Sequence, residues 1–284
     1  MRDGVLGGAT GADSRQSGDE LSIVRVTDYA SADLLVALEL YNQMIPVQQR
    51  QGSAAEILEQ LQSARQRRSQ GLCEFEDCHF VAKLGSAVCG YMQLFFQPVE
   101  KFAFVGFLVV RASLSLGTQM AWVATRMCEE VTRRVDMDDE FGRCDRIFLE
   151  LDDPGRATDE KSRRRGGRRV ARFEAICKRF GKPLRFLDFD YVQARLGLPD
   201  DWPGPERPHL LGYLSKRTDS SMEGERVRNV LRLIYTGLNP EGVYHGNAEK
   251  DRQYRSYLNE LCTRECARVP ETVRLLPAGE VLAK

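Results

Sequence analysis

The chain of 284 residues lacks three features that would define its class at once: a net charge, a long apolar run and a regular cysteine framework. Its 41 basic residues balance 41 acidic ones, so the charge of the whole molecule gives no reason to expect a polyanionic partner. No run reaches the roughly 18 apolar residues of a membrane-spanning helix, and residues 1–20 contain no apolar signal segment. We therefore expect a cytoplasmic protein without a membrane partner.

The eight cysteines and three histidines form no recognisable metal site. Most cysteines fall in apolar segments at irregular spacings, so we interpret them as reduced thiols. Cys73 with Cys78 and His79, and Cys262 with Cys266, are the two groups that resemble ligand pairs. Neither has the spacing of a structural zinc site, and the scattered histidines give little support to hydrolytic metal chemistry or His-based triads. We predict no metal site.

What is present is the composition of an ordinary globular protein, with 42% hydrophobic and 29% charged residues. Alternation of apolar and polar residues predicts a strand at 21–26, and strand-like apolar runs predict strands at 79–84, 88–96, 103–110, 146–151 and 183–189. Helical periodicity predicts helices around 34–44, 53–61, 120–135 and 167–180. This order predicts a mixed α/β domain with a central sheet flanked by helices.

The composition changes after this domain. Four prolines cluster within 197–222, which we interpret as a linker or loop. Helical periodicity returns around Val227–Ile234 and Tyr254–Leu261, before a short strand at 272–276. The expected organisation is a flexible leader at 1–20, a main domain at 21–196, the linker at 197–222 and a mainly helical C-terminal extension at 223–284.

The segment from Phe104 to Met120 runs from a strand through a short loop into a helix. Exposed backbone amides at a helix N-terminus attract phosphate, and a glycine in the loop allows close approach of a ligand to the backbone. Gly117 is the glycine in that position. The alternative is that Gly117 serves only as a turn residue before the helix.

The element order of residues 21–190 resembles the GNAT superfamily of acyl-CoA-dependent N-acetyltransferases. Three stretches carry the resemblance: Phe107–Val110 leading into Leu116–Met120, the run Ile147–Phe180, and Cys177-Lys-Arg-Phe-Gly181, which is similar to the family's Tyr-x-x-x-Gly. The resemblance implies acetyl-CoA as cosubstrate, with the fourth strand pairing with the pantetheine arm and the following amides binding the pyrophosphate. The residues it implies for this role are Leu108, Val109, Val110, Leu116, Gly117, Thr118, Gln119 and Met120.

The pyrophosphate loop departs from the family's pattern. The family usually has Arg/Gln-x-x-Gly-x-Gly/Ala, whereas this chain has Leu114-Ser-Leu-Gly117-Thr-Gln119. One glycine is kept, the basic or amide residue is missing, and the second glycine is glutamine. The alternative is therefore that the loop binds the CoA pyrophosphate only weakly.

Acetyl transfer from CoA to an amine needs a base for the amine and an acid for the departing thiolate. Glu150 lies in the fifth strand, with Asp152 and Asp153 at its end, and each is a candidate base. Cys177 stands where the family has its tyrosine and is the candidate acid. Solvated strand-end carboxylates and a buried inert thiol are the alternatives, and we expect that water supplies the proton while Cys177 fills space.

Residues 161–169 are the densest basic segment, expected just before the helix at 167–180. Arginine binds phosphate through paired hydrogen bonds, so Arg168 and Arg169 are assigned to the CoA phosphates. A solvated loop and a nucleic-acid backbone contact are the alternatives. Because no aromatic residue is interleaved between the arginines, we predict no specific nucleic-acid recognition.

These patterns support three functional hypotheses. The first is an acetyl-CoA-dependent N-acetyltransferase that modifies a primary amine of a small molecule or peptide by direct attack on the thioester, with a homodimer left open. The second is a non-catalytic GNAT-like domain that binds CoA or another protein. The third is a nucleic-acid-associated protein built around the arginine run.

Overall fold

The computed structural model describes residues 20–44, 75–111, 117–137, 146–179, 181–194, 207–215, 218–238 and 247–283, together with Cys144 and parts of 53–62. The expected leader at 1–20 lies outside the described residues except for Glu20. So do Cys73, Leu116 and three of the four prolines in the expected linker.

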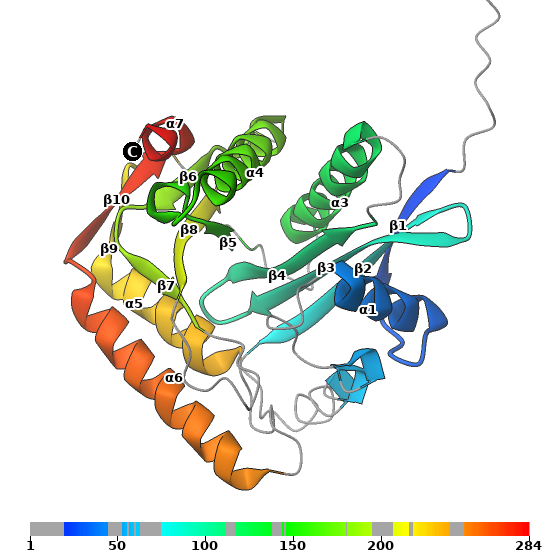
Figure 1. Cartoon of the computed structure of the whole chain (residues 1–284), viewed down its shortest axis with the longest axis horizontal. Coiled ribbons are helices and arrows are strands. Elements are labelled where there is room, and N and C mark those ends of the chain that lie inside the picture. The colour runs from blue at the N-terminus through cyan, green and yellow to red at the C-terminus, as the bar shows by residue number, and fades with distance from the viewer. Residues whose placement is uncertain are drawn as a thin grey trace, which may run out of the picture.

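A ten-stranded sheet forms the centre of the molecule, in the order β1-β2-β3-β4-β5-β8-β6-β10-β9, with β7 paired to β8 (Figure 1). Among the described strands, β4 and β5 form the only parallel pair. The strands are β1 (Leu21–Val26), β2 (Glu76–Leu84), β3 (Ala87–Gln97), β4 (Phe102–Val110), β5 (Arg146–Asp152), β6 (Leu184–Leu187), β7 (Tyr191–Gln193), β8 (Arg207–Ser215), β9 (Ser221–Glu223) and β10 (Thr272–Pro277).

Helices cover both faces of the sheet (Figure 1). Buried side chains of α3, α4 and α7 share one core cluster on one face, while those of α1, α5 and α6 belong to two clusters on the other. The helices are α1 (Ala32–Met44), α3 (Gly117–Met137), η3 (Pro154–Arg156), α4 (Glu160–Arg179), α5 (Gly224–Arg232), the π-helix η4 (Leu233–Gly237), α6 (Ala248–Arg268) and α7 (Ala278–Leu282). The mixed α/β fold with a central sheet flanked by helices is therefore confirmed.

Two segments differ from their sequence-based predictions. Residues 207–215, expected within a linker, form β8, which pairs with both β5 and β6 inside the sheet. The helix expected from Gly167 begins at Glu160, because Asp159 accepts a hydrogen bond from the Ser162 amide at 2.8 Å and so caps it. The basic run therefore lies within α4 and not in a loop before it.

The C-terminal extension is mainly helical, and it also adds a strand to the central sheet. Its strand β10 pairs with β6 on one side and with β9 on the other. No helix in the described part of the chain is long and apolar enough to cross a membrane.

Candidate active site

Strands β4 and β5 run side by side and then separate. Their parallel pairing extends from Phe102 with Arg146 to Val105 with Leu149. Beyond Val105, no strand of the described chain pairs with β4 on that side. Beyond these pairs the ends of β4 and β5 are not hydrogen-bonded to each other, and we call this interruption of the pairing the gap between the two strands.

Gly106 is a bulge at the point of separation. Its neighbours Val105 and Phe107 pair with the consecutive residues Leu94 and Gln93, so Gly106 is the extra residue in β4. A bulge bends its strand and increases the local twist, which accounts for the departure of β4 from β5. A Cβ atom at position 106 would lie 2.6 Å from Cε2 of Phe95, so a side chain there requires the ring to move.

The end of β4 presents backbone groups to the gap. The Arg111 amide donates to the Cys89 carbonyl of β3 at 2.8 Å. Backbone groups of an antiparallel strand alternate in direction, so those of Leu108 and Val110 point away from β3 and toward the gap. The backbone of Val109 points toward β3. Two of these three expected cofactor residues thus offer an open edge that an extended ligand with amide groups can pair with.

Helix α3 begins beside this edge. Gly117, Thr118, Gln119 and Met120 form its first turn, whereas Leu116 lies outside the described residues. The first amides of a helix have no partner within the helix, and they favour an anion. The strand edge and helix N-terminus expected from the sequence therefore follow each other along the chain, with β4 ending at Val110 and α3 beginning at Gly117.

Glu150 is the first residue of β5 beyond its last pair with β4. Strand alternation places it on the face of Phe148, opposite α3 and α4. The Tyr191 hydroxyl donates to its Oε1, and Nε2 of Gln193 donates to its Oε2 at 2.5 Å. Both carboxylate oxygens are therefore held by donors from β7.

The phenol of Tyr191 is fixed as a donor. Its side chain is buried, and burial together with the charge of Glu150 raises the pKa of Tyr191 well above its ordinary value. The phenol therefore stays protonated in neutral and moderately basic solution and keeps donating to the carboxylate.

Asp152 and Asp153 have structural contacts. Asp152 Oδ2 lies 2.6 Å from Nη1 of Arg169 and 4.0 Å from Nε of Arg165, both in α4. Asp153 accepts a hydrogen bond from the Gly155 amide at 2.9 Å and caps η3. Of the candidate bases, Glu150 is the one beside the point where the strands separate.

Arg169 and Arg168 differ in their surroundings. Arg169 is engaged by Asp152. Arg168 is exposed, and its guanidinium has no side-chain partner among the described residues. Of the two arginines assigned to phosphate, Arg168 is therefore the one whose charge is not paired with a carboxylate of the described residues.

Cys177 lies in the core between α4 and the sheet, with 3% of its surface exposed. Burial, with a smaller contribution from Cys128, raises the pKa of Cys177 to about 12. A free cysteine has a pKa of about 8.5, so this thiol is a weaker acid than the one it would need to reprotonate.

We predict that Cys177→Ala lowers kcat by less than about tenfold, below the usual contribution of a general acid. Steady-state kinetics with acetyl-CoA, together with thermal unfolding, will check this. A hundredfold loss in a variant that folds and binds CoA normally would make the thiol the acid.

The residues that sequence reasoning missed are Gly106, Tyr191 and Gln193. Gly106 had a signal, because an isolated glycine inside an apolar strand indicates a bulge. Tyr191 and Gln193 alternate along β7, but they lie 41 and 43 residues from Glu150 in the sequence. No local pattern connects positions so far apart.

The cysteines of the described chain are free thiols, with Sγ of Cys262 and Cys266 3.9 Å apart within α6. Within the described ranges, no group of three or more His, Cys, Asp or Glu side chains is arranged to hold a metal ion.

Neither a family model nor a curated protein matches this sequence. Solved structures with a similar fold include a Bacteroides thetaiotaomicron protein described as an acetyltransferase of the GNAT family, with 17% identity, a TM-score of 0.49, and coverage of 76% of this chain and 98% of that one. Another is the ribosomal-protein-S5-alanine acetyltransferase of Vibrio fischeri, with 10% identity, a TM-score of 0.43, and coverage of 70% and 94%.

A third is a Salmonella typhimurium protein described as an acetyltransferase and solved with acetyl-CoA, with 13% identity, a TM-score of 0.40, and coverage of 70% and 96%. At these values the likeness describes the arrangement of the elements, and no activity follows from it. The three solved structures that share this arrangement of elements are described as acetyltransferases, one of them of the GNAT family.

Proposed function

We propose that the chain is an acetyl-CoA-dependent N-acetyltransferase that modifies a primary amine of a small molecule or peptide. The observation that carries the proposal is the separation of β4 from β5 at the Gly106 bulge, beside a carboxylate held by two donors. The open edge of β4 suits the amide groups of the pantetheine arm. The N-terminus of α3 suits the pyrophosphate.

In the proposed reaction, Glu150 takes a proton from the ammonium group of the acceptor. The amine nitrogen then attacks the thioester carbonyl, so that a carbon–nitrogen bond forms and the carbon–sulfur bond breaks. The nitrogen releases its second proton to water, the CoA thiolate gains one from water, and Glu150 returns its proton to the solvent, so that one proton is released overall. The products are the acetylated amine and free CoA.

The acetyltransferase proposal is tested by measuring free thiol released from acetyl-CoA with a panel of alkylamines, amino acids and short peptides. We expect at least one amine to raise thiol release above hydrolysis, with a matching acetylated product in mass spectrometry. A chain that binds acetyl-CoA but acetylates none of these amines would instead be a non-catalytic CoA-binding domain.

For the phosphate contact we predict that Arg168→Ala weakens CoA binding about threefold, as expected for an exposed ion pair. The affinity for dephospho-CoA should stay unchanged, because the 3′-phosphate is the expected partner. Arg179→Ala, at the other end of the same helix, is the matched control. An equal loss of affinity for CoA and for dephospho-CoA would show that Arg168 does not contact the 3′-phosphate.

A further inference from the structure

The strand that holds Glu150 is itself weakly paired. β7 has three residues, and among the described strands it pairs with β8 alone. Its central residue Val192 lies opposite Pro208. Proline has no backbone amide hydrogen, so the hydrogen bonds between β7 and β8 come from the flanking pairs, Tyr191 with His209 and Gln193 with Arg207. So short a pairing leaves the position of Tyr191 and Gln193 dependent on other contacts as well.

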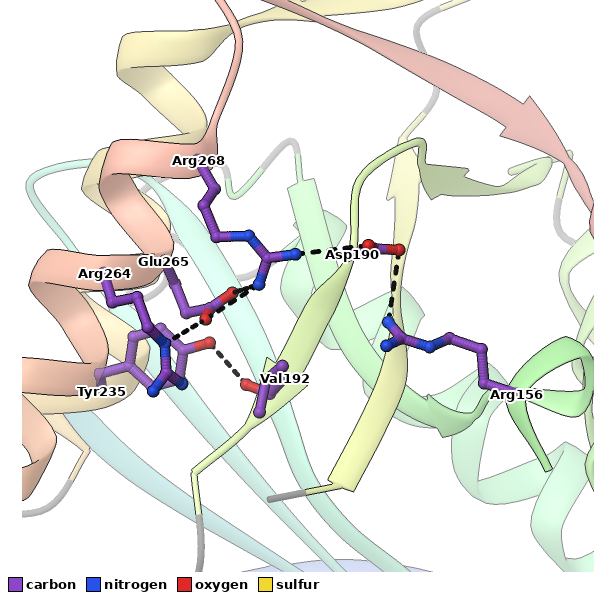
Figure 2. A network of polar contacts seen from close by, with 7 residues as sticks. All are labelled: Arg156, Asp190, Val192, Tyr235, Arg264, Glu265 and Arg268. Carbon is purple, nitrogen blue, oxygen red and sulfur yellow. Dashed lines mark hydrogen bonds and ion pairs between the residues drawn. The ribbon is translucent and has the colours of Figure 1, made fainter. Parts of the chain in front are cut away.

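Tyr235 supplies such a contact from the π-helix η4. Its hydroxyl donates to the Val192 carbonyl at 2.5 Å (Figure 2). Its ring also stacks on that of Tyr191, with centroids 6.1 Å apart and planes 19° from parallel. One buried side chain thus holds both the backbone of β7 and the ring that donates to Glu150.

The hydroxyl of Tyr235 remains a donor under ordinary conditions. Burial and the charge of Glu265 raise the pKa of Tyr235 far above its ordinary value. Glu265 is fully buried, and Arg264 and Arg268 contact its carboxylate at 3.0 Å and 3.2 Å. The charges around Tyr235 thus keep its phenol protonated.

A second set of contacts holds Asp190, the residue before β7. Arg156 of η3 lies 3.3 Å from one carboxylate oxygen, and Arg268 of α6 lies 3.3 Å from the other (Figure 2). The Asp190 side chain is 63% exposed, and exposed ion pairs contribute little. The buried hydrogen bond from Tyr235 is therefore the stronger anchor of β7.

We propose that Tyr235 of the C-terminal extension is a positioning residue that sets the orientation of the Glu150 carboxylate through β7. This inference rests on the proposed role of Glu150 as base. The extension thereby contributes to turnover without touching the substrate. Tyr191 and Gln193 are the links, because each donates to one oxygen of the carboxylate.

The test compares Tyr235→Phe with Tyr254→Phe in the full chain. Tyr235→Phe keeps the ring and removes only the hydroxyl. We expect kcat to fall about tenfold with KM for acetyl-CoA within about twofold, since small misplacement of a reacting group lowers kcat strongly. Tyr254 is a buried tyrosine of α6, whereas Tyr235 lies in η4, and the Tyr254→Phe variant should keep wild-type kcat.

The double variant Tyr235→Phe/Glu150→Gln distinguishes a positioning role from a general loss of structure. If Tyr235 acts through Glu150, Tyr235→Phe lowers turnover no further in a Glu150→Gln background. The same fractional loss in both backgrounds, or unchanged turnover in Tyr235→Phe alone, would overturn the inference while the acetyltransferase proposal stands. Wild-type turnover in Glu150→Gln would instead overturn the role of Glu150 as base, and the positioning role with it.

Hydrogen exchange gives a readout independent of activity. We expect Tyr235→Phe to speed exchange of the amides of Gln193 and His209, in β7 and β8, about fivefold, because a net hydrogen bond contributes about 1 kcal/mol. Amides of β2 and β3 should be unaffected. Unchanged exchange in β7 would show that Tyr235 does not anchor the strand, even if no amine substrate is found.

Discussion

Glu150→Gln is expected to lower kcat by about 10²–10⁴, the range of a lost general base, while KM for acetyl-CoA stays within about twofold. The amide is nearly isosteric with the carboxylate, but it cannot take the proton from the acceptor ammonium. Steady-state kinetics with the best amine of the panel, from pH 6 to 9, will measure both constants.

Two variants control for this substitution. Glu223→Gln makes the same change at an exposed position whose side chain makes no capping hydrogen bond. It should leave kcat and KM unchanged. Asp152→Asn removes the ion pair with Arg169, and we expect it to lower kcat less than about tenfold. A large loss of kcat in Asp152→Asn, together with near wild-type kcat in Glu150→Gln, would identify Asp152 as the base instead.

Gly224→Ala is expected to have the largest effect on stability. Gly224 begins α5, where its amide donates to the Glu271 carbonyl at 2.7 Å. A Cβ atom there would overlap the backbone carbonyl of Pro270, which no side-chain rotation can relieve. We expect a loss of about 3 kcal/mol in the free energy of unfolding, and a midpoint lower by roughly 6–12 °C.

The matched control for Gly224→Ala is Gly279→Ala in α7. No atom lies within 4 Å of a Cβ at that position, so its free energy of unfolding should change by no more than about 0.5 kcal/mol. Thermal unfolding followed by circular dichroism compares the two. Equal midpoints for Gly224→Ala and wild type would contradict the close packing of α5 against Pro270.

The sequence predicts the order of elements up to residue 190 because each element there has its own local pattern, either a hydrophobic period or a continuous apolar run. The hairpin of β2 and β3 is an example, with its turn at Gly85 and Ser86 between two apolar runs. The strand at 207–215 escaped prediction because nearby prolines dominate its local composition. Its place between β5 and β6 is decided by pairing with segments distant in the sequence.

The site was predictable only where one segment carries it. Glu150 could be named because it is an acidic residue near the end of the fifth predicted strand, and Gly117 because it stands just before a predicted helix. The donors to Glu150 come from β7, and the anchor of β7 comes from η4, beyond β8 in the sequence. Such a network depends on tertiary packing and has no local signature.

Calorimetric titration of the full chain with acetyl-CoA tests the acetyltransferase account most directly. The account predicts saturable binding at one site per chain, with a Kd between about 1 µM and 1 mM, the range of ordinary substrate constants. The absence of saturable heat at acetyl-CoA concentrations well above about 1 mM would contradict it.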